Sequence, residues 1–165
     1  MAPSLKETAA VGTAARMPAA GKVRPLAINT DAVSVVYTGL TETLCAARLG
    51  GALATKMGVP LRVVHFRAVP RQLDIDRPDG LSPIESEEFT TRLLEEGISA
   101  RARVYLCRDE MTSIPYAFKP HSIVVIGGPH SWLPTRIERW RHALEDAGHF
   151  VVLVEPSARK EHVDA

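Results

Sequence analysis

The chain has 165 residues, an ordinary apolar content and a formal net charge of +1 at pH 7. This length suffices for one domain around one core. The near-neutral charge argues against a nucleic-acid binder, which needs a basic face. No apolar run reaches the roughly 18 residues that a membrane span needs. Cys45 and Cys107 form no CxxC pair, so we expect a reduced, cytoplasmic protein without a membrane partner.

The two ends of the chain differ in composition from the middle. Residues 1–31 are rich in Ala, Pro, Gly and Thr, and polar residues interrupt every apolar stretch that a secretory signal would require. The last residues, 157–165, are charged and show no periodic pattern. We therefore predict a flexible N-terminal tail (1–31), one α/β domain (32–156) and a flexible C-terminal tail (157–165).

The first part of the domain alternates between strand and helix patterns. Residues 32–37 (AVSVVY) are mostly apolar, which is typical of a strand buried in a parallel sheet. Thr41 is expected to cap the helix that follows, and Gly58 to end it. Small residues line much of this helix, which lets it lie close to a sheet. The second strand is predicted at 61–66, with His65 near its end.

The middle of the domain continues this alternation. A long polar loop precedes a capping-box pattern at 82–85, which predicts a helix that ends at Gly97. The third strand is predicted at 102–107. The arginines at 101 and 103, like those at 136, 139 and 141, are interrupted by other residue types and are interpreted as solvated surface.

The stretch from His121 to Pro156 gives the clearest fold signal. It predicts a buried strand (123–126), a turn at Gly127 and Gly128, a helix from Pro134 to about Gly148, and a closing strand, Phe150–Val154. Five strands with about four helices and short crossovers predict a doubly wound, five-stranded parallel sheet.

This succession resembles the universal stress protein family over residues 32–156. The segments that carry the resemblance are VSVVYTGLTETLCAARLGGALATKMGVPLRVVHF, SIVVIGG and HFVVLVEP. The resemblance implies a three-layer sandwich of the adenine-nucleotide-alpha-hydrolase-like or flavodoxin-like kind, with strand order 3-2-1-4-5. It also implies a UspA-like regulatory role and, in some members, ATP binding.

The ATP-binding members of that family place an Asp at the end of the first strand and a G-x-x-G loop, followed by G-[ST], after the fourth. Carried over by position, the Asp falls on Thr38, the first glycine on Gly127 and the second on His130, while the later pair falls near Trp140. Glycines let backbone N–H groups approach phosphate closely, so these departures argue against ATP binding in the family manner. No cofactor is predicted firmly, and ATP or another adenine nucleotide is the candidate.

A sparse polar set is expected at the carboxyl ends of the strands, where doubly wound sheets bind ligands. The candidate nucleotide- or anion-binding residues are Thr38, Gly39, Thr41, His65, Gly127, Gly128, His130 and Ser131. The glycine pair is equally well explained as a tight turn. A zinc site would require His65, Cys107 and His130 to converge, and no ligand pair at short spacing supports it, so no metal site is predicted.

Two functional hypotheses fit these residues. The first is a non-catalytic regulatory or stress-response module with an altered nucleotide or anion pocket and, as partner, a second copy or another protein. The second is a small nucleotide-handling enzyme that uses His130 and the loop 127–131. The sequence favours the first, because it contains no recognisable acid–base pair, partnered nucleophile or complete phosphate loop. No catalytic residue is therefore predicted.

The last predicted strand also points to self-association. In the implied sheet order this strand lies at an edge, and an apolar edge without charges invites pairing with another chain. The resemblance implies the same homodimer contact across a two-fold axis. The candidate interface residues are Phe150, Val151, Val152, Leu153 and Val154.

Overall fold

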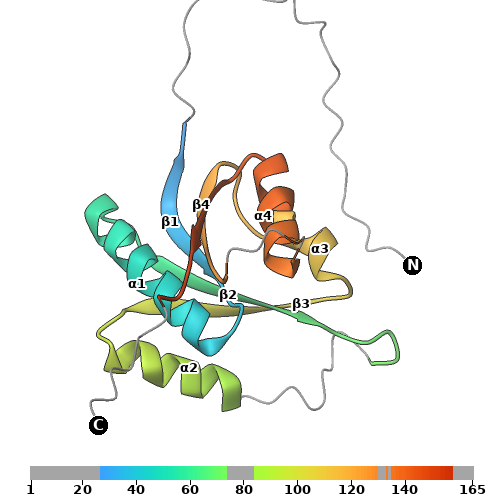
Figure 1. Cartoon of the computed structure of the whole chain (residues 1–165), viewed down its shortest axis with the longest axis horizontal. Coiled ribbons are helices and arrows are strands. Elements are labelled where there is room, and N and C mark those ends of the chain that lie inside the picture. The colour runs from blue at the N-terminus through green and yellow to red at the C-terminus, as the bar shows by residue number, and fades with distance from the viewer. Residues whose placement is uncertain (1–26, 74–83, 130–132, 134, 158–165) are drawn as a thin grey trace, which may run out of the picture.

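The computed structural model describes residues 27–73, 84–129, 133 and 135–157, and it forms a three-layer α/β sandwich (Figure 1). In chain order the elements are β1 (Asn29–Val36), α1 (Leu40–Met57), β2 (Leu61–Ala68), α2 (Ile84–Glu95), β3 (Ala100–Cys107), α3 (Glu110–Ser113), the 3-10 turn η1 (Ile114–Tyr116), β4 (Ser122–Gly127), α4 (Arg136–Asp146) and β5 (Phe150–Val154).

The sheet confirms the predicted fold. Its order is β3-β2-β1-β4-β5, and every neighbouring pair is parallel. β1 lies at the centre, and its central residues Val33, Val35 and Val36 are fully buried. Continuous apolar strands are favoured here because helices cover both faces of a parallel sheet.

Each face of the sheet has its own apolar core. On one face α1 and α2 pack through small and aromatic residues, among them Ala46, Ala47 and Phe89. On the other face η1 and α4 pack through Ile114 and Trp140. Figure 1 shows α1 and α2 on one side of the strands and α3 and α4 on the other. The chain therefore changes face between the β1–α1 and β4–α4 units.

The small residues of α1 bring it close to the sheet, as expected. Gly50 is buried against β1, and a Cβ built there would lie 2.9 Å from Val35 Cγ2. The larger Leu49, one residue earlier, is 38% exposed and points away from this contact. The buried face of the helix is thus its small-residue face.

Several element boundaries differ from the predicted ones. β1 begins at Asn29, inside the predicted tail, because the Asn29 amide donates a 2.9 Å hydrogen bond to the carbonyl of His121. Residues 1–26 of that tail lie outside the described residues, as do residues 158–165 of the predicted C-terminal tail. α4 begins at Arg136 rather than at Pro134, because Thr135 caps it. β5 is only half-buried along its whole length, because it lies at the edge of the sheet.

We predict that alanine substitutions at two adjacent glycines of α1 change stability in opposite directions. Gly50→Ala would force a Cβ against Val35 and Leu61 in the core, and it should cost about 1–3 kcal/mol of unfolding free energy. At Gly51 the nearest side-chain atoms are 3.8 Å from such a Cβ, so Gly51→Ala should gain up to about 1 kcal/mol from helix propensity. Urea unfolding of both variants measures the difference, and equal losses would contradict the close approach of α1.

Candidate functional site

The topological switch point of the sheet lies between β1 and β4. These two strands are neighbours, but the chain leaves β1 toward α1 on one face and leaves β4 toward α4 on the other. In open parallel sheets such a switch point, outside the carboxyl ends of the strands, forms the usual binding crevice. Thr38, Gly39, Gly127 and Gly128 all lie there, as predicted.

The loop after β1 is organised by Thr43 rather than by Thr41. The Thr43 hydroxyl accepts hydrogen bonds from the amides of Thr38 and Gly39, at 3.1 and 3.4 Å. Gly39 occupies the N-cap position of α1, and no side chain makes a capping bond there. The expected cap at Thr41 is therefore wrong: this residue lies in the first turn, exposed to solvent.

Gly127 is a packing glycine. A Cβ at this position would overlap with the backbone carbonyl of Glu42, so the first turn of α1 rests directly on the end of β4. The Thr38 hydroxyl reinforces this contact by donating a 2.7 Å hydrogen bond to the Gly127 carbonyl. Only glycine fits where two backbones approach this closely.

The space over Gly128 is occupied as well, here by a side chain. A Cβ at Gly128 would overlap with Ile137 Cδ1 from the first turn of α4. The Gly128 amide, which a phosphate cradle would need, instead donates a 2.9 Å hydrogen bond to the carbonyl of Val154. The glycine pair therefore holds α1, α4 and β5 against the end of β4.

A small hollow remains beside this contact. It has a volume of about 160 Å³ and is lined by Thr38, Thr135, Arg136, Ile137 and Trp140. The Arg136 guanidinium lies 4.3 Å from the centre of the Trp140 ring and forms an ion pair with Glu110. The buried Trp140 Nε1 has no hydrogen-bond partner among the described residues.

Sequence reasoning missed Thr135 and Arg136 as lining residues of this hollow. The Thr135 hydroxyl accepts a 3.2 Å hydrogen bond from the Glu138 amide, which is the N-cap bond of α4. The signal was present as Thr135 followed three residues later by Glu138, a capping-box spacing. Arg136 gave no such signal, because its partner Glu110 is distant in sequence.

His65 does not join this crevice. It lies inside β2, three residues before the strand ends at Ala68, and its ring centre is 4.5 Å from that of Tyr37. Because it shares a face with Val63, it packs on the α1/α2 side of the sheet. Its placement is that of an aromatic packing residue.

Cys107 and Asp109, at the end of β3, have structural partners. The Cys107 thiol donates a 3.7 Å hydrogen bond to the carbonyl of Arg67, and burial raises the pKa of this thiol. Asp109 caps α3 by accepting a 2.9 Å hydrogen bond from the Met111 amide. Among the described residues no group of His, Cys, Asp and Glu could hold a metal ion. The predicted residues His130 and Ser131 lie outside the described residues.

Comparisons with known proteins give a likeness in structure but no match in sequence. No family model and no curated protein matches the sequence. Among solved structures, the chain is similar to a universal stress protein family member from Burkholderia pseudomallei, with 16% identity and a TM-score of 0.44, over 78% of this chain and 98% of that chain. In the part of the chain that the structure describes, no helix is long and apolar enough to cross a membrane.

We predict that Thr43 and Thr41 differ in their effect on stability although both lie in the first turn of α1. Thr43→Val keeps the side-chain shape but leaves the amides of Thr38 and Gly39 without their acceptor, so it should cost about 1–3 kcal/mol. Thr41→Val, the matched control, should stay within about 0.5 kcal/mol of wild type. Urea unfolding tests both, and a larger loss at Thr41 would restore it as the cap.

Proposed function

We propose that this protein is a non-catalytic regulatory module of the universal stress protein type, with a small ligand pocket at the carboxyl edge of its sheet. The observation that carries the proposal is the closure of the crevice. The backbone carbonyl of Glu42 fills the space over Gly127, and the Ile137 side chain fills the space over Gly128. The switch point, where open parallel sheets commonly bind ligands, lacks here the room that a nucleotide phosphate chain would occupy next to the two glycines.

The charges around the crevice support an altered pocket rather than an ATP cradle. The Glu42 carboxylate lies against the start of α1, where a Cβ on Gly39 would be 2.6 Å from Glu42 Oε2. A phosphate approaching this turn would meet a like charge. The hollow of about 160 Å³ is also smaller than the roughly 300–1,000 Å³ of common ligand pockets. A small anion held by Arg136 and the N-terminus of α4 fits better.

The chemistry of the described side chains supports a binding role over catalysis. A cysteine nucleophile needs a thiolate, which a lowered thiol pKa favours. Burial instead raises the pKa of the Cys107 thiol. Arg136 and its partner Glu110 are engaged in an ion pair, and Thr135 in the cap of α4. These groups can bind and orient a ligand, but they do not pair a nucleophile with a base.

We predict that ATP stabilises the protein little. Millimolar ATP–Mg acting on a micromolar site would add roughly 4 kcal/mol, which raises the melting temperature of a domain this size by about 10 °C. With the crevice closed by Glu42 and Ile137, we expect a shift below about 1 °C in a thermal-shift assay. Magnesium chloride at equal ionic strength is the control. A shift of several degrees specific to the nucleotide would contradict this prediction.

We also propose that the module is a homodimer paired through β5. The two edges of the sheet differ in charge: β3 reads ARARVYLC, whereas β5 reads FVVLV. Charged side chains on an edge discourage strand pairing, and their absence permits it. The half-buried residues of β5 would lose their remaining exposure in such a pair. This contrast favours β5 over β3 as the contact.

We predict that a lysine on β5, but not one on β3, separates the two copies. Val152→Lys should convert a dimer into a monomer by light scattering at high micromolar concentration, because it places a charge at the paired edge. Val104→Lys is the matched control, since Val104 is 49% exposed on the opposite edge.

Val152 also touches the core of the α1/α2 face, so the melting temperature of each variant establishes that it is folded. A wild-type monomer at high micromolar concentration contradicts the proposal. A dimer that survives Val152→Lys and is lost in Val104→Lys moves the contact to β3.

A further inference from the structure

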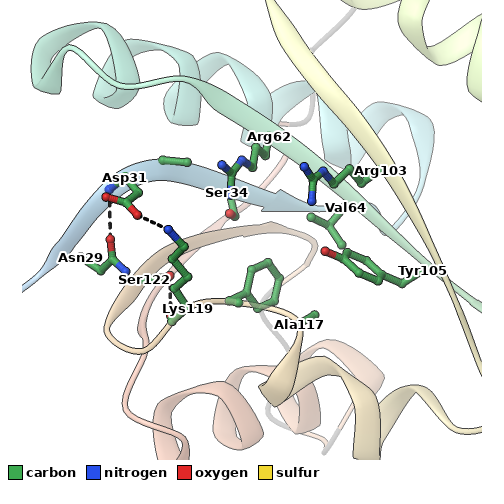
Figure 2. A pocket seen from close by; sticks show the side chains of 12 residues that line it. Asn29, Asp31, Ser34, Arg62, Val64, Arg103, Tyr105, Ala117, Lys119 and Ser122 are labelled. Carbon is green, nitrogen blue, oxygen red and sulfur yellow. Dashed lines mark hydrogen bonds and ion pairs between the residues drawn. The ribbon is translucent and has the colours of Figure 1, made fainter.

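A second hollow lies on the α3/α4 face of the sheet, toward the amino ends of the strands. The crossover from β3 to β4, residues 108–121, contains no helix beyond the four residues of α3 and the three of η1. The central residues of β3 consequently stay exposed. A cavity of about 170 Å³ opens there, with β1, β2 and β3 as its floor and the segment 117–119 as its wall (Figure 2).

Three arginines project from this face of the sheet, and two of them line the cavity. In a parallel sheet, paired residues project to the same face, and the register pairs Arg62 with Arg101 and Val64 with Arg103. Arg62 and Val64 are two residues apart and also share a face, so all three guanidinium groups project from the same side. Arg62 and Arg103 line the cavity, and Figure 2 shows them between Asp31 and Tyr105.

None of these arginines is held by an ion pair in the described part of the chain. No hydrogen bond or ion pair joins Arg62, Arg101 or Arg103 to another described side chain. The carboxylate that lines the cavity, Asp31, is held by Lys119 through an ion pair. That bond lowers the pKa of Asp31, and Arg62 adds a smaller effect in the same direction. The lining carries a net excess of positive charge.

The neutral lining residues suit a compact oxyanion. Ser34 is 5% exposed, and its hydroxyl makes no hydrogen bond to another described residue, so it is available as a donor next to Arg62. Tyr105 stacks on Phe66 with ring centres 5.8 Å apart, which fixes its ring at the far end of the cavity. Figure 2 shows its hydroxyl end turned back toward Arg103.

We propose that this cavity binds the phosphoryl group of a small molecule between Arg62 and Arg103, with the Ser34 hydroxyl as a further donor. Planar guanidinium groups make paired, charge-assisted hydrogen bonds to phosphate oxygens. A volume of about 170 Å³ far exceeds the roughly 10–15 Å³ that one water needs. It is still below that of a typical drug-sized pocket, so one phosphoryl group with a short organic remainder fits. The site is separate from the carboxyl-edge hollow and does not depend on the function proposed for it.

A purely structural role does not explain these arginines. Arg62 and Arg101 are direct neighbours on adjacent strands, where like charges destabilise a sheet. Residues that cost stability and make no internal bond are typical of binding sites, whose ligand supplies the missing partner. Removing one arginine should therefore leave the free protein as stable as wild type, or more stable, while weakening ligand binding.

The test is a titration with inorganic phosphate, followed by amide chemical shifts and melting temperature at constant ionic strength. We expect saturable binding by wild type, with the largest shifts around residues 34, 62, 103 and 105. Arg62→Gln and Arg103→Gln should each raise the dissociation constant tenfold or more, at an unchanged or higher melting temperature without phosphate. Arg139→Gln, which removes the same charge from an exposed position on α4, is the matched control. Glycerol 3-phosphate, as a second probe, should bind more tightly if the organic remainder also contacts the cavity.

Each alternative outcome has a defined meaning. If Arg139→Gln weakened phosphate binding equally, the affinity would depend on net charge only, and the proposal would be overturned. Binding that is lost in Arg136→Gln but kept in Arg62→Gln would place the anion at the carboxyl edge instead, and would also overturn it. A lower melting temperature of both arginine variants with unchanged phosphate affinity would assign them a structural role. An effect of ATP that disappears in the Arg62→Gln/Arg103→Gln double variant belongs to this cavity and leaves the closed crevice intact.

Discussion

The contact between the first turn of α1 and the end of β4 shapes the carboxyl edge of the sheet. The Glu42 carbonyl occupies the space over Gly127, and the Thr38 hydroxyl bonds the Gly127 carbonyl from the same loop. Thr43 holds that loop through two backbone amides. Because the two backbones touch, no side chain and no ligand atom fits between them. The same contact therefore fixes the position of α1 on the sheet and closes the crevice.

Much of the fold follows from local sequence patterns. Continuous apolar runs predicted buried parallel strands, and the small residues of α1 predicted its close approach, which Gly50 confirms. Gly58 and Gly148 have the left-handed backbone expected at helix ends. The strand order came from the family resemblance, and the structure has the same order. The strands and helix ends could be predicted because each depends on residues that are close in sequence. The strand order could be predicted because the order of strands and helices along the chain persists when individual residues change.

The site was less predictable because its character depends on what meets across the fold. A glycine pair shows that side chains are absent, but not whether a phosphate, a carbonyl or an isoleucine fills the space. Gly127 and Gly128 were therefore compatible with a cradle and with a turn until Glu42 and Ile137 were placed. Likewise, Arg101 and Arg103 were interpreted as solvated surface. Only the register, which sets Arg62 beside Arg101, shows that three like charges share one face.

The short crossover between β3 and β4 connects the two hollows physically. Glu110, at its start, holds Arg136 at the carboxyl edge, while Lys119, at its end, holds Asp31 at the rim of the arginine cavity. Between them Ile114 is fully buried, and the Pro115 carbonyl accepts a hydrogen bond from His149 just before β5. The segment 110–119 thus holds Arg136 beside one hollow, lines the other through residues 117–119, and bonds the residue that precedes β5. An anion that competed for Arg136 or Lys119 would remove a contact of this segment. Energetic coupling between the two hollows would then require that the segment have two packed arrangements.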